Sequence, residues 1–317
     1  MAGTPSPLAR RRGRHSSPAP IQAEAGRGDS VVDLHTHTLR SDGILEPADL
    51  VRAAAAVGIR TLAITDHDNL GAYRELIDGR AVPPSLELIP GVEINALSRG
   101  IRLADGELHI LGFGMDPDDD ALEAALASQR AARRQRFERT VARLREIGLG
   151  IDEQIAHVAL TRDDALGRPT IGRALIAAGY ATSVEDAFRR LIGWGGPAYV
   201  QREGMGPREA IDVIGAAGGV PVLAHFSEAP EQVPLIRELR EMGLAGLEVF
   251  YISFAPETVE AVGSVAAKLG LLATGGSDYH GDTSTYAEAH ASLRVPSIVG
   301  ERLRAAIAST PRTMTGP

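Results

Sequence analysis

The stretch Val31-Val32-Asp33-Leu34-His35-Thr36-His37 is a short apolar run that ends on two histidines two positions apart. On an extended strand the side chains at positions i and i+2 point to the same face, so both imidazoles can reach one cation. The pattern returns near the other end of the chain, where Leu271-Leu272-Ala273-Thr274 precedes Asp278 and His280. Two such pairs at the carboxyl ends of expected strands indicate an α/β barrel, because that rim is where barrel enzymes gather their functional groups.

Ionisable side chains also accompany the apolar runs between these two pairs. Further strands are expected at 61–65, 86–95, 108–112, 220–225 and 246–250, and the associated histidines and carboxylates are Asp42, His67, Glu93, His109 and His225. We expect each of the histidines to lie at the carboxyl end of its strand. Helical segments separate most of the strands, so the chain contains about seven strand–helix units and predicts a mostly parallel sheet.

Between Pro117 and Pro197 this alternation stops, and only helices are expected. Asp118-Asp119-Asp120 provides an acidic first turn for a long helix that ends near Gly148, and two shorter helices are expected at 169–179 and 184–192. We therefore divide the chain into a discontinuous barrel of residues 29–115 and 201–312 and a helical insertion of residues 116–200 that governs substrate selectivity. Residues 1–28, which are rich in Arg, Ser, Pro and Gly, are expected to form a disordered tail.

Composition excludes several classes of function. The 317 residues include no cysteine, which removes disulfides, thiolate metal sites and cysteine nucleophiles. The net charge of −8 argues against stable binding of long nucleic acids but allows a local arginine pocket. No apolar run has the length of a membrane span, and the first residues lack the apolar segment of a secretory signal, so a cytoplasmic protein is expected.

Several motifs, in order along the chain, resemble those of the polymerase and histidinol phosphatase (PHP) superfamily. They are His35-Thr36-His37 with Ser41-Asp42-Gly43, Thr65-Asp66-His67-Asp68, Pro90-Gly91-Val92-Glu93-Ile94 and Gly276-Ser277-Asp278-Tyr279-His280-Gly281. The helical insertion is similar to that of the bacterial members that act as 3′,5′-nucleoside bisphosphate phosphatases and 5′-to-3′ exoribonucleases. The resemblance implies an α/β fold built on a distorted (β/α)7 TIM-like barrel.

The resemblance also implies two to three divalent metal ions. It assigns His35, His37, Glu93 and Asp278 to a first metal, Asp42, His67 and His280 to a second, and His109, His225 and a bridging Glu93 to a third. Taken singly, His109 or His225 fits a hydrogen-bonded core histidine better than a ligand; as members of the set, both are expected to bind metal. Nitrogen and oxygen ligands suit manganese, which we favour, and also zinc, iron or magnesium.

Phosphate esters resist hydrolysis because their anionic oxygens repel nucleophiles. Clustered divalent ions neutralise those oxygens and lower the pKa of bound water to about 7. A metal-bridging hydroxide is therefore the expected nucleophile, and no side chain is assigned as a catalytic acid or base.

The insertion contains the candidates for substrate contacts. Gly167-Arg168-Pro169-Thr170 resembles the family's arginine-proline element, and Arg168 is either a bidentate phosphate ligand or a surface arginine near a helix start. Arg202 is a weaker candidate of the same kind, and Tyr199 is either a stacking platform for a base or a packed aromatic residue. Family members often carry histidine at position 170 and His-Pro-Gly-Arg where this chain has His225-Phe226-Ser227-Glu228, which leaves the substrate open.

We therefore expect a phosphoesterase acting on 3′,5′-nucleoside bisphosphates, nucleoside monophosphates or the 5′ ends of short RNA. The alternatives are a phosphatase of another small ester, such as histidinol phosphate, and a metal-binding module without turnover. Complete ligand motifs argue against the last of these.

Overall fold

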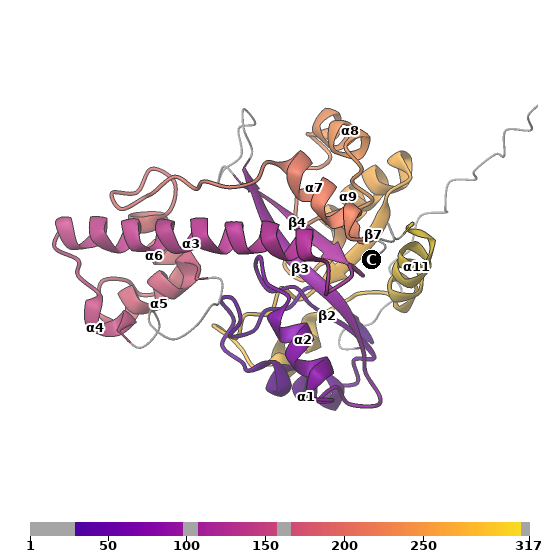
Figure 1. Cartoon of the computed structure of the whole chain (residues 1–317), viewed down its shortest axis with the longest axis horizontal. Coiled ribbons are helices and arrows are strands. Elements are labelled where there is room, and N and C mark those ends of the chain that lie inside the picture. Colours follow the sequence, from indigo (N-terminus) through magenta and orange to yellow (C-terminus); the bar gives the residue numbers. More distant parts are fainter. Residues whose placement is uncertain (1–28, 98–106, 157–165, 312–317) are drawn as a thin grey trace, which may run out of the picture.

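In the computed structural model (Figure 1), residues 29–97, 107–156 and 166–311 are described, and the expected N-terminal tail lies outside them. Seven strands form one sheet in chain order, namely β1 (Val32–Asp33), β2 (Thr61–Ile64), β3 (Glu87–Leu97), β4 (Glu107–Phe113), β5 (Val220–Leu223), β6 (Gly246–Tyr251) and β7 (Leu272–Gly276). The sheet nearly closes, because Leu34 N–H donates to Gly275 O at 3.2 Å and Asp278 N–H donates to His35 O at 2.7 Å. The predicted α/β barrel is confirmed.

One strand runs against the others. β4 is antiparallel to both β3 and β5, with Asn95 opposite His109 and Ile110 opposite Leu223. Only nine residues separate Leu97 from Glu107, too few for the helical crossover that parallel neighbours require, so the two strands form a hairpin. His109 is consequently near the start of its strand, and the expectation that it ends a strand is wrong. Reversal of the strand still brings His109 to the ligand-bearing rim of the barrel.

In the described part of the chain, seven helices surround the sheet: α1 (Pro47–Ala56), α2 (Gly71–Asp78), α7 (Pro207–Ala216), α8 (Val233–Glu241), α9 (Pro256–Leu269), α10 (Tyr286–Ser292) and α11 (Ser297–Ser309). Several begin with proline in the first turn, where its missing N–H costs no hydrogen bond. Each long helix buries one apolar stripe; in α1 the stripe includes Leu50 and Val51, both fully buried. Burial of such side chains contributes about 1.5–3 kcal/mol each, so the barrel core fixes the rim on which the site is built.

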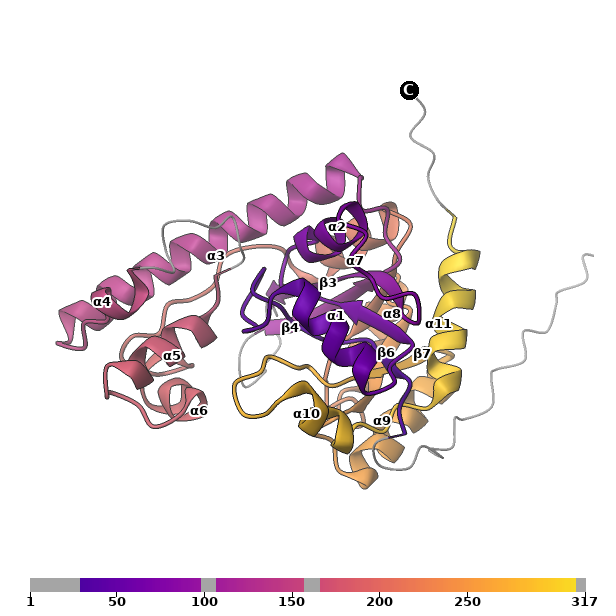
Figure 2. The ribbon, with the colours of Figure 1, turned by 90° about the horizontal axis from the view of Figure 1, so that it is seen from below.

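The helical insertion consists of α3 (Asp120–Glu146), α4 (Asp152–Ile155), α5 (Arg168–Ala177), α6 (Val184–Ala187) and the π-helical turn η1 (Phe188–Ile192). Figures 1 and 2 show α3 as a long rod that lies on the barrel at its start and carries α4, α5 and α6 along its far half. Leu122 and Leu126 of α3 pack in the barrel core, whereas Phe137 and Leu144 belong to a second core shared with α5. α3 therefore belongs to both bodies. Among the described helices, none is long and apolar enough to span a membrane.

Candidate metal centre

The seam between β1 and β7 positions the two ligand pairs predicted from sequence. Buried Asp33 accepts hydrogen bonds from the backbone N–H and hydroxyl of Ser277, at 2.9 and 2.7 Å, and from the Tyr286 hydroxyl at 2.8 Å. A Cβ at Gly276 would lie 2.5 Å from the backbone nitrogen of His35, so glycine is required for the strands to approach this closely. The seam brings the His35–His37 pair beside the Asp278–His280 pair.

The structure gathers all nine residues of the predicted ligand set at one rim. Three groups place their ligand atoms within 4.8 Å of one another, namely His37, Asp42, His67 and His280; His35, His37 and Glu93; and Glu93, His109 and His225. Asp278 lies outside these groups, but its Oδ1 is 3.3 Å from His35 Nε2 and 3.1 Å from His37 Nε2. Candidate ligands from β1, β2, β3, β4, β5 and β7 or the loops that follow thus converge although the first and last, at positions 35 and 280, are 245 positions apart in the sequence.

Glu93 is the common member of two groups. Its Oε2 faces His67 Nδ1 at 3.0 Å, His37 Nε2 at 3.3 Å and His35 Nε2 at 3.5 Å. Its Oε1 faces His109 Nδ1 at 2.6 Å and His225 Nε2 at 3.4 Å. The two oxygens of this carboxylate therefore serve different histidines, which is the geometry of a bridging ligand.

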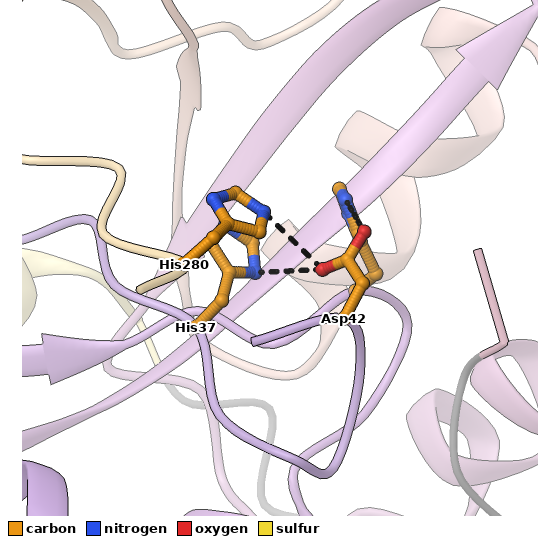
Figure 3. Close-up of side chains that lie close together, drawn as sticks. His37, Asp42 and His280 are labelled. Carbon is orange, nitrogen blue, oxygen red and sulfur yellow. Dashed lines mark ion pairs between the residues drawn. The ribbon is translucent and has the colours of Figure 1, made fainter. Parts of the chain in front are cut away.

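Asp42 is the carboxylate of the group that Glu93 does not belong to (Figure 3). Its Oδ1 lies 3.3 Å from His280 Nε2 and 3.7 Å from His37 Nδ1, and its Oδ2 lies 3.4 Å from His67 Nε2. A Cβ at Gly167 would approach Asp42 Oδ2 to 2.9 Å, so the residue that begins the arginine-proline element leaves room beside this carboxylate.

The donor atoms at the centre suit cations. His35 Nε2, His37 Nε2, His67 Nδ1 and both carboxylate oxygens of Asp42 are buried and have no hydrogen-bond partner among the described residues. A buried polar atom without a partner costs about 1–3 kcal/mol, a penalty that coordination to metal would remove. The combination of imidazole and carboxylate, without thiolate, fits divalent manganese, zinc, iron or magnesium. The residues present therefore fit a multi-metal site.

The three carboxylates of the centre are ionised at neutral pH. Burial alone would raise the pKa of Asp42, Glu93 and Asp278, but the neighbouring histidines outweigh it and hold each pKa well below its usual range. Histidines must be neutral to bind metal. Divalent cations would replace the histidine protons and supply the positive charge that keeps the three buried carboxylates ionised.

Glu248 of β6 is a buried site residue that the sequence reasoning missed. Its carboxylate oxygens lie 3.0 and 3.2 Å from His35 Nδ1, and one of them accepts the backbone N–H of His225 at 2.8 Å. A carboxylate on one imidazole nitrogen fixes the tautomer in which the other nitrogen faces the metal. An ionisable residue in the apolar run Leu247-Glu248-Val249 was the signal that could have revealed it.

The backbone is strained at the same place. Of the four described non-glycine residues with positive φ, three lie at the rim: Asp68 (51°), His225 (31°) and Asp278 (49°). Each costs about 1–3 kcal/mol and persists only where surrounding contacts enforce it. Tyr251 supplies one such contact, since its hydroxyl donates to Asp278 Oδ2 at 3.0 Å and leaves Oδ1 toward the histidines.

A buried network of arginines forms one wall of a cavity of about 210 Å³ over the metal centre. It comprises Arg133, Arg136, Arg168 and Arg202 with two carboxylates, Asp68 and Glu107. Arg136 Nη1 lies 2.7 Å from Glu107 Oε1, and Arg202 Nη2 lies 3.2 Å from Asp68 Oδ2. Four positive groups face two negative ones, which leaves an excess of two positive charges in the wall.

Electrostatics within this wall follow from burial and from the crowding of like charges. Burial and the adjacent Arg133 lower the pKa of Arg202 to about 10. Burial alone would raise the pKa of Glu107, but Arg202, Arg136 and Arg168 hold it well below its usual range. Arg136 Nη2 and Arg202 Nε are buried and have no hydrogen-bond partner among residues 29–97, 107–156 and 166–311.

The predicted substrate contacts differ in where they lie. Arg168 lines the cavity, with its guanidinium carbon 4.9 Å from the centre of the Phe188 ring, and Arg202 lines it while 4% exposed. Tyr199 is not among the residues that line the cavity; its ring packs edge-on against Trp194, and Arg136 lies over it at 5.8 Å. Arg133 and Arg136, which line the cavity from α3, were missed by the sequence reasoning.

Comparisons with known proteins agree with this geometry. The sequence model of the PHP domain matches residues 33–162. The 5′-3′ exoribonuclease of Escherichia coli is 33% identical over 258 residues, which cover 79% of this chain and 85% of that protein. The 3′,5′-nucleoside bisphosphate phosphatase of Chromobacterium violaceum is 30% identical over 253 residues, covering 78% and 87% respectively. The crystal structure of a Bifidobacterium adolescentis protein assigned as a metal-dependent phosphoesterase superposes with a TM-score of 0.75 at 30% identity, over 87% of this chain and 96% of that one.

Proposed function

The chain belongs to the PHP family of metal-dependent phosphoesterases, and from that premise we propose that its substrates are nucleotides carrying a second phosphate. Candidates are 3′,5′-nucleoside bisphosphates and the 5′-phosphorylated ends of short RNA. Both activities are named for relatives with about a third of their residues in common with this chain. The reaction is hydrolysis of a phosphate ester bond.

The observation that carries the proposal is the excess positive charge beside the metal centre. The arginine wall and the histidine cluster line the same cavity, so a ligand there meets both. Planar guanidinium groups recognise phosphate by paired, charge-assisted hydrogen bonds. A substrate with one phosphate at the metal centre and another at the arginines would satisfy Arg136 Nη2 and Arg202 Nε, which have no hydrogen-bond partner within the part of the chain that the structure describes.

We assign the metal ligands as the sequence motifs imply. His35, His37, Glu93 and Asp278 would hold a first ion, Asp42, His67 and His280 a second, and His109, His225 and Glu93 a third, with manganese the favoured metal. Bound divalent ions would supply charge neutralisation of the phosphate and activation of water. Glu248 would orient His35, and Tyr251 would orient Asp278. The arginine wall would bind the second phosphate.

The insertion of residues 116–200 supplies selectivity in this proposal. Arg133 and Arg136 lie on α3 and Arg168 begins α5, so three of the four arginines of the wall come from the insertion. Arg202 lies two positions beyond the end of the insertion. A small ester with a single phosphate, such as histidinol phosphate, would place no anionic group at these arginines. Histidinol phosphate is therefore the weaker candidate.

The test is a phosphate-release panel with manganese-loaded protein and a variant of the wall. We expect adenosine 3′,5′-bisphosphate to be hydrolysed with a higher kcat/KM than adenosine monophosphates or histidinol phosphate. Arg168→Met should reduce that preference by about tenfold or more, the value of a bidentate charged contact. Arg189→Met, at an exposed arginine of the same insertion, is the matched control and should keep the preference. Equal activity on histidinol phosphate and the bisphosphate, in wild type and variant alike, would refute a second-phosphate site.

A further inference from the structure

Arg173, on α5 of the insertion, contacts the barrel rim beside the metal centre, although it is not among the residues that line the cavity. Its Nη2 lies 2.7 Å from Asp282 Oδ2, its Nε donates to Asp282 Oδ1, and Nη2 also donates to the backbone carbonyl of Asp42. Asp42 is a candidate ligand, and Asp282 lies two positions after the candidate ligand His280. One guanidinium therefore bonds to the two loops that carry members of the same ligand group.

These two loops also contact each other directly. Ile44 N–H donates to His280 O at 3.0 Å, and a Cβ at Gly281 would lie 2.4 Å from Ile44 Cγ1. Gly281 has a φ of 87°, a conformation that favours glycine. The loop of Asp42 and the loop of His280 thus meet backbone to backbone, and Arg173 bonds to both of them within two residues of this junction.

The positions of the loops determine how the ligands face each other. His280 Nδ1 lies 2.8 Å from the backbone carbonyl of Asp278, so the loop backbone orients the ring, and its Nε2 faces Asp42 Oδ1 at 3.3 Å (Figure 3). Both carboxylate oxygens of Asp42 lack a hydrogen-bond partner in the part of the chain that the structure describes. The placement of this carboxylate therefore follows from its backbone, which Arg173 contacts.

α5 presents Arg173 from a core of its own. Ile171 and Leu175, two positions to either side, are fully buried in the core of the insertion. Side chains two positions apart do not share a helix face, so Arg173 points away from that core. Its side chain is only 27% exposed, and a guanidinium can hold a carboxylate and a carbonyl at once with a fixed geometry. The insertion thus supplies a cation in a defined position at the rim.

We propose that Arg173 is a positioning residue for the second metal ion, the one assigned to Asp42, His67 and His280. The inference rests on the metal assignment of the proposed function. The insertion contributes no ligand to this ion, but through Arg173 it holds two barrel loops at the separation that lets their ligands bind together. Loss of a contact behind the ligands weakens metal binding about 10–100-fold. The third ion, around His109, should be unaffected.

The test measures manganese affinity by elemental analysis after dialysis against buffered manganese. We expect Arg173→Met to bind one ion about 10–100-fold more weakly than the wild type. Arg173→Lys, which keeps the charge but not the paired donors, and Asp282→Asn should show a smaller loss of the same kind. Arg145→Met is the matched control; it removes an arginine that pairs with Asp152 elsewhere in the insertion and should bind manganese like the wild type.

Double variants identify which ion is weakened. In a His67→Ala background the second ion has already lost a ligand, so adding Arg173→Met should cause little further loss. In a His109→Ala background the full loss of about 10–100-fold should remain, because the two changes then affect different ions. A purely structural role of Arg173 would give the same further loss in both backgrounds.

Wild-type manganese affinity in Arg173→Met would overturn the inference, and so would equal further losses in the two histidine backgrounds. If Arg173→Met does not fold, the comparison is made with Arg173→Lys and Asp282→Asn, and wild-type affinity in both overturns it. A wild-type protein that binds no manganese would instead refute the metal assignment. Failure of the metal-loaded wild type on every nucleotide would refute the proposed function and leave the comparison of affinities valid.

Discussion

At the scale of single residues, the least obvious contribution to the metal centre comes from Glu248. One carboxylate holds the Nδ1 side of His35 and the backbone N–H of His225, two residues assigned to different metals. His225 has a positive φ of 31°, a conformation that needs such an anchor. Glu248 therefore couples the orientation of two ligands without touching the metal-facing atoms of either.

Replacement of Glu248 by glutamine should weaken metal binding. A glutamine is uncharged and replaces one carboxylate oxygen by an NH₂ group, so it would hold the Nδ1–H of His35 and the backbone N–H of His225 less strongly, and its amide hydrogens would oppose a donor on their side. We expect affinity for the metals to fall about 10–100-fold, the usual effect of losing such a partner. Metal content by elemental analysis and the His35 tautomer by nitrogen NMR measure this directly.

Glu238→Gln, on the exposed face of α8, is the matched control and should bind metal like the wild type. A Glu248→Gln protein with the full metal complement and an unaltered His35 tautomer would show that Glu248 only fills space.

At the scale of elements, local periodicity predicted the strands and the two i, i+2 pairs, and the resemblance to the PHP superfamily implied the full ligand set. The i, i+2 spacing of His35 and His37 follows from strand geometry alone, so neighbouring residues were sufficient to find it. The direction of β4, and the choice of which residues of α3 face the cavity, depend on contacts between residues distant in sequence. α3 contains seven arginines, and sequence could not single out Arg133 and Arg136 as the two that line the cavity, because their neighbours are equally polar.

Glu107 links β4 to α3 and α5, a contact between elements that local periodicity does not predict. It lies at the start of β4 and accepts from Arg136 of α3, and Arg168 of α5 lies 3.5 Å from the same oxygen. Its pKa is lowered in the folded protein, so its charge stabilises the fold above the pKa of the unfolded chain, about 4.3. As the pH falls below that value, this stabilisation is lost by about 1.4 kcal/mol per pH unit.

Glu107→Gln should therefore destabilise the protein at pH 7 by about 3–5 kcal/mol, the cost of leaving a buried charge without its partner. Urea unfolding at pH 7 and at pH 3.5 provides the measurement, and the difference from wild type should be smaller at the lower pH. Glu203→Gln, at a carboxylate 66% exposed that pairs with Arg139, should change stability little at either pH. A Glu107→Gln difference that grows on acidification would contradict the sign of the shift.

At the scale of the whole molecule, the metal centre and the closure of the barrel occupy the same place. The candidate ligands lie between positions 35 and 280, and the first and last of them flank the β1–β7 seam. The insertion has its own core, centred on residues such as Phe137 and Leu144, and contributes no ligand to these groups. Metal binding should thus stabilise the barrel seam more than the insertion.

Removal of metal by a chelator tests this coupling. A ligand that binds only the folded state stabilises it by about 2.7 kcal/mol at a hundredfold excess over its Kd, which corresponds to a Tm change of about 5 °C in a protein of this size. Hydrogen exchange should accelerate on chelation in residues 33–37 and 275–280, while α5 exchanges at the same rate. The variant His67→Ala, which lacks a ligand of the group around Asp42, should lose less Tm on chelation than the wild type. Equal Tm values with and without chelator would contradict a coupling between metal binding and closure of the barrel. Faster hydrogen exchange confined to the insertion would contradict it as well.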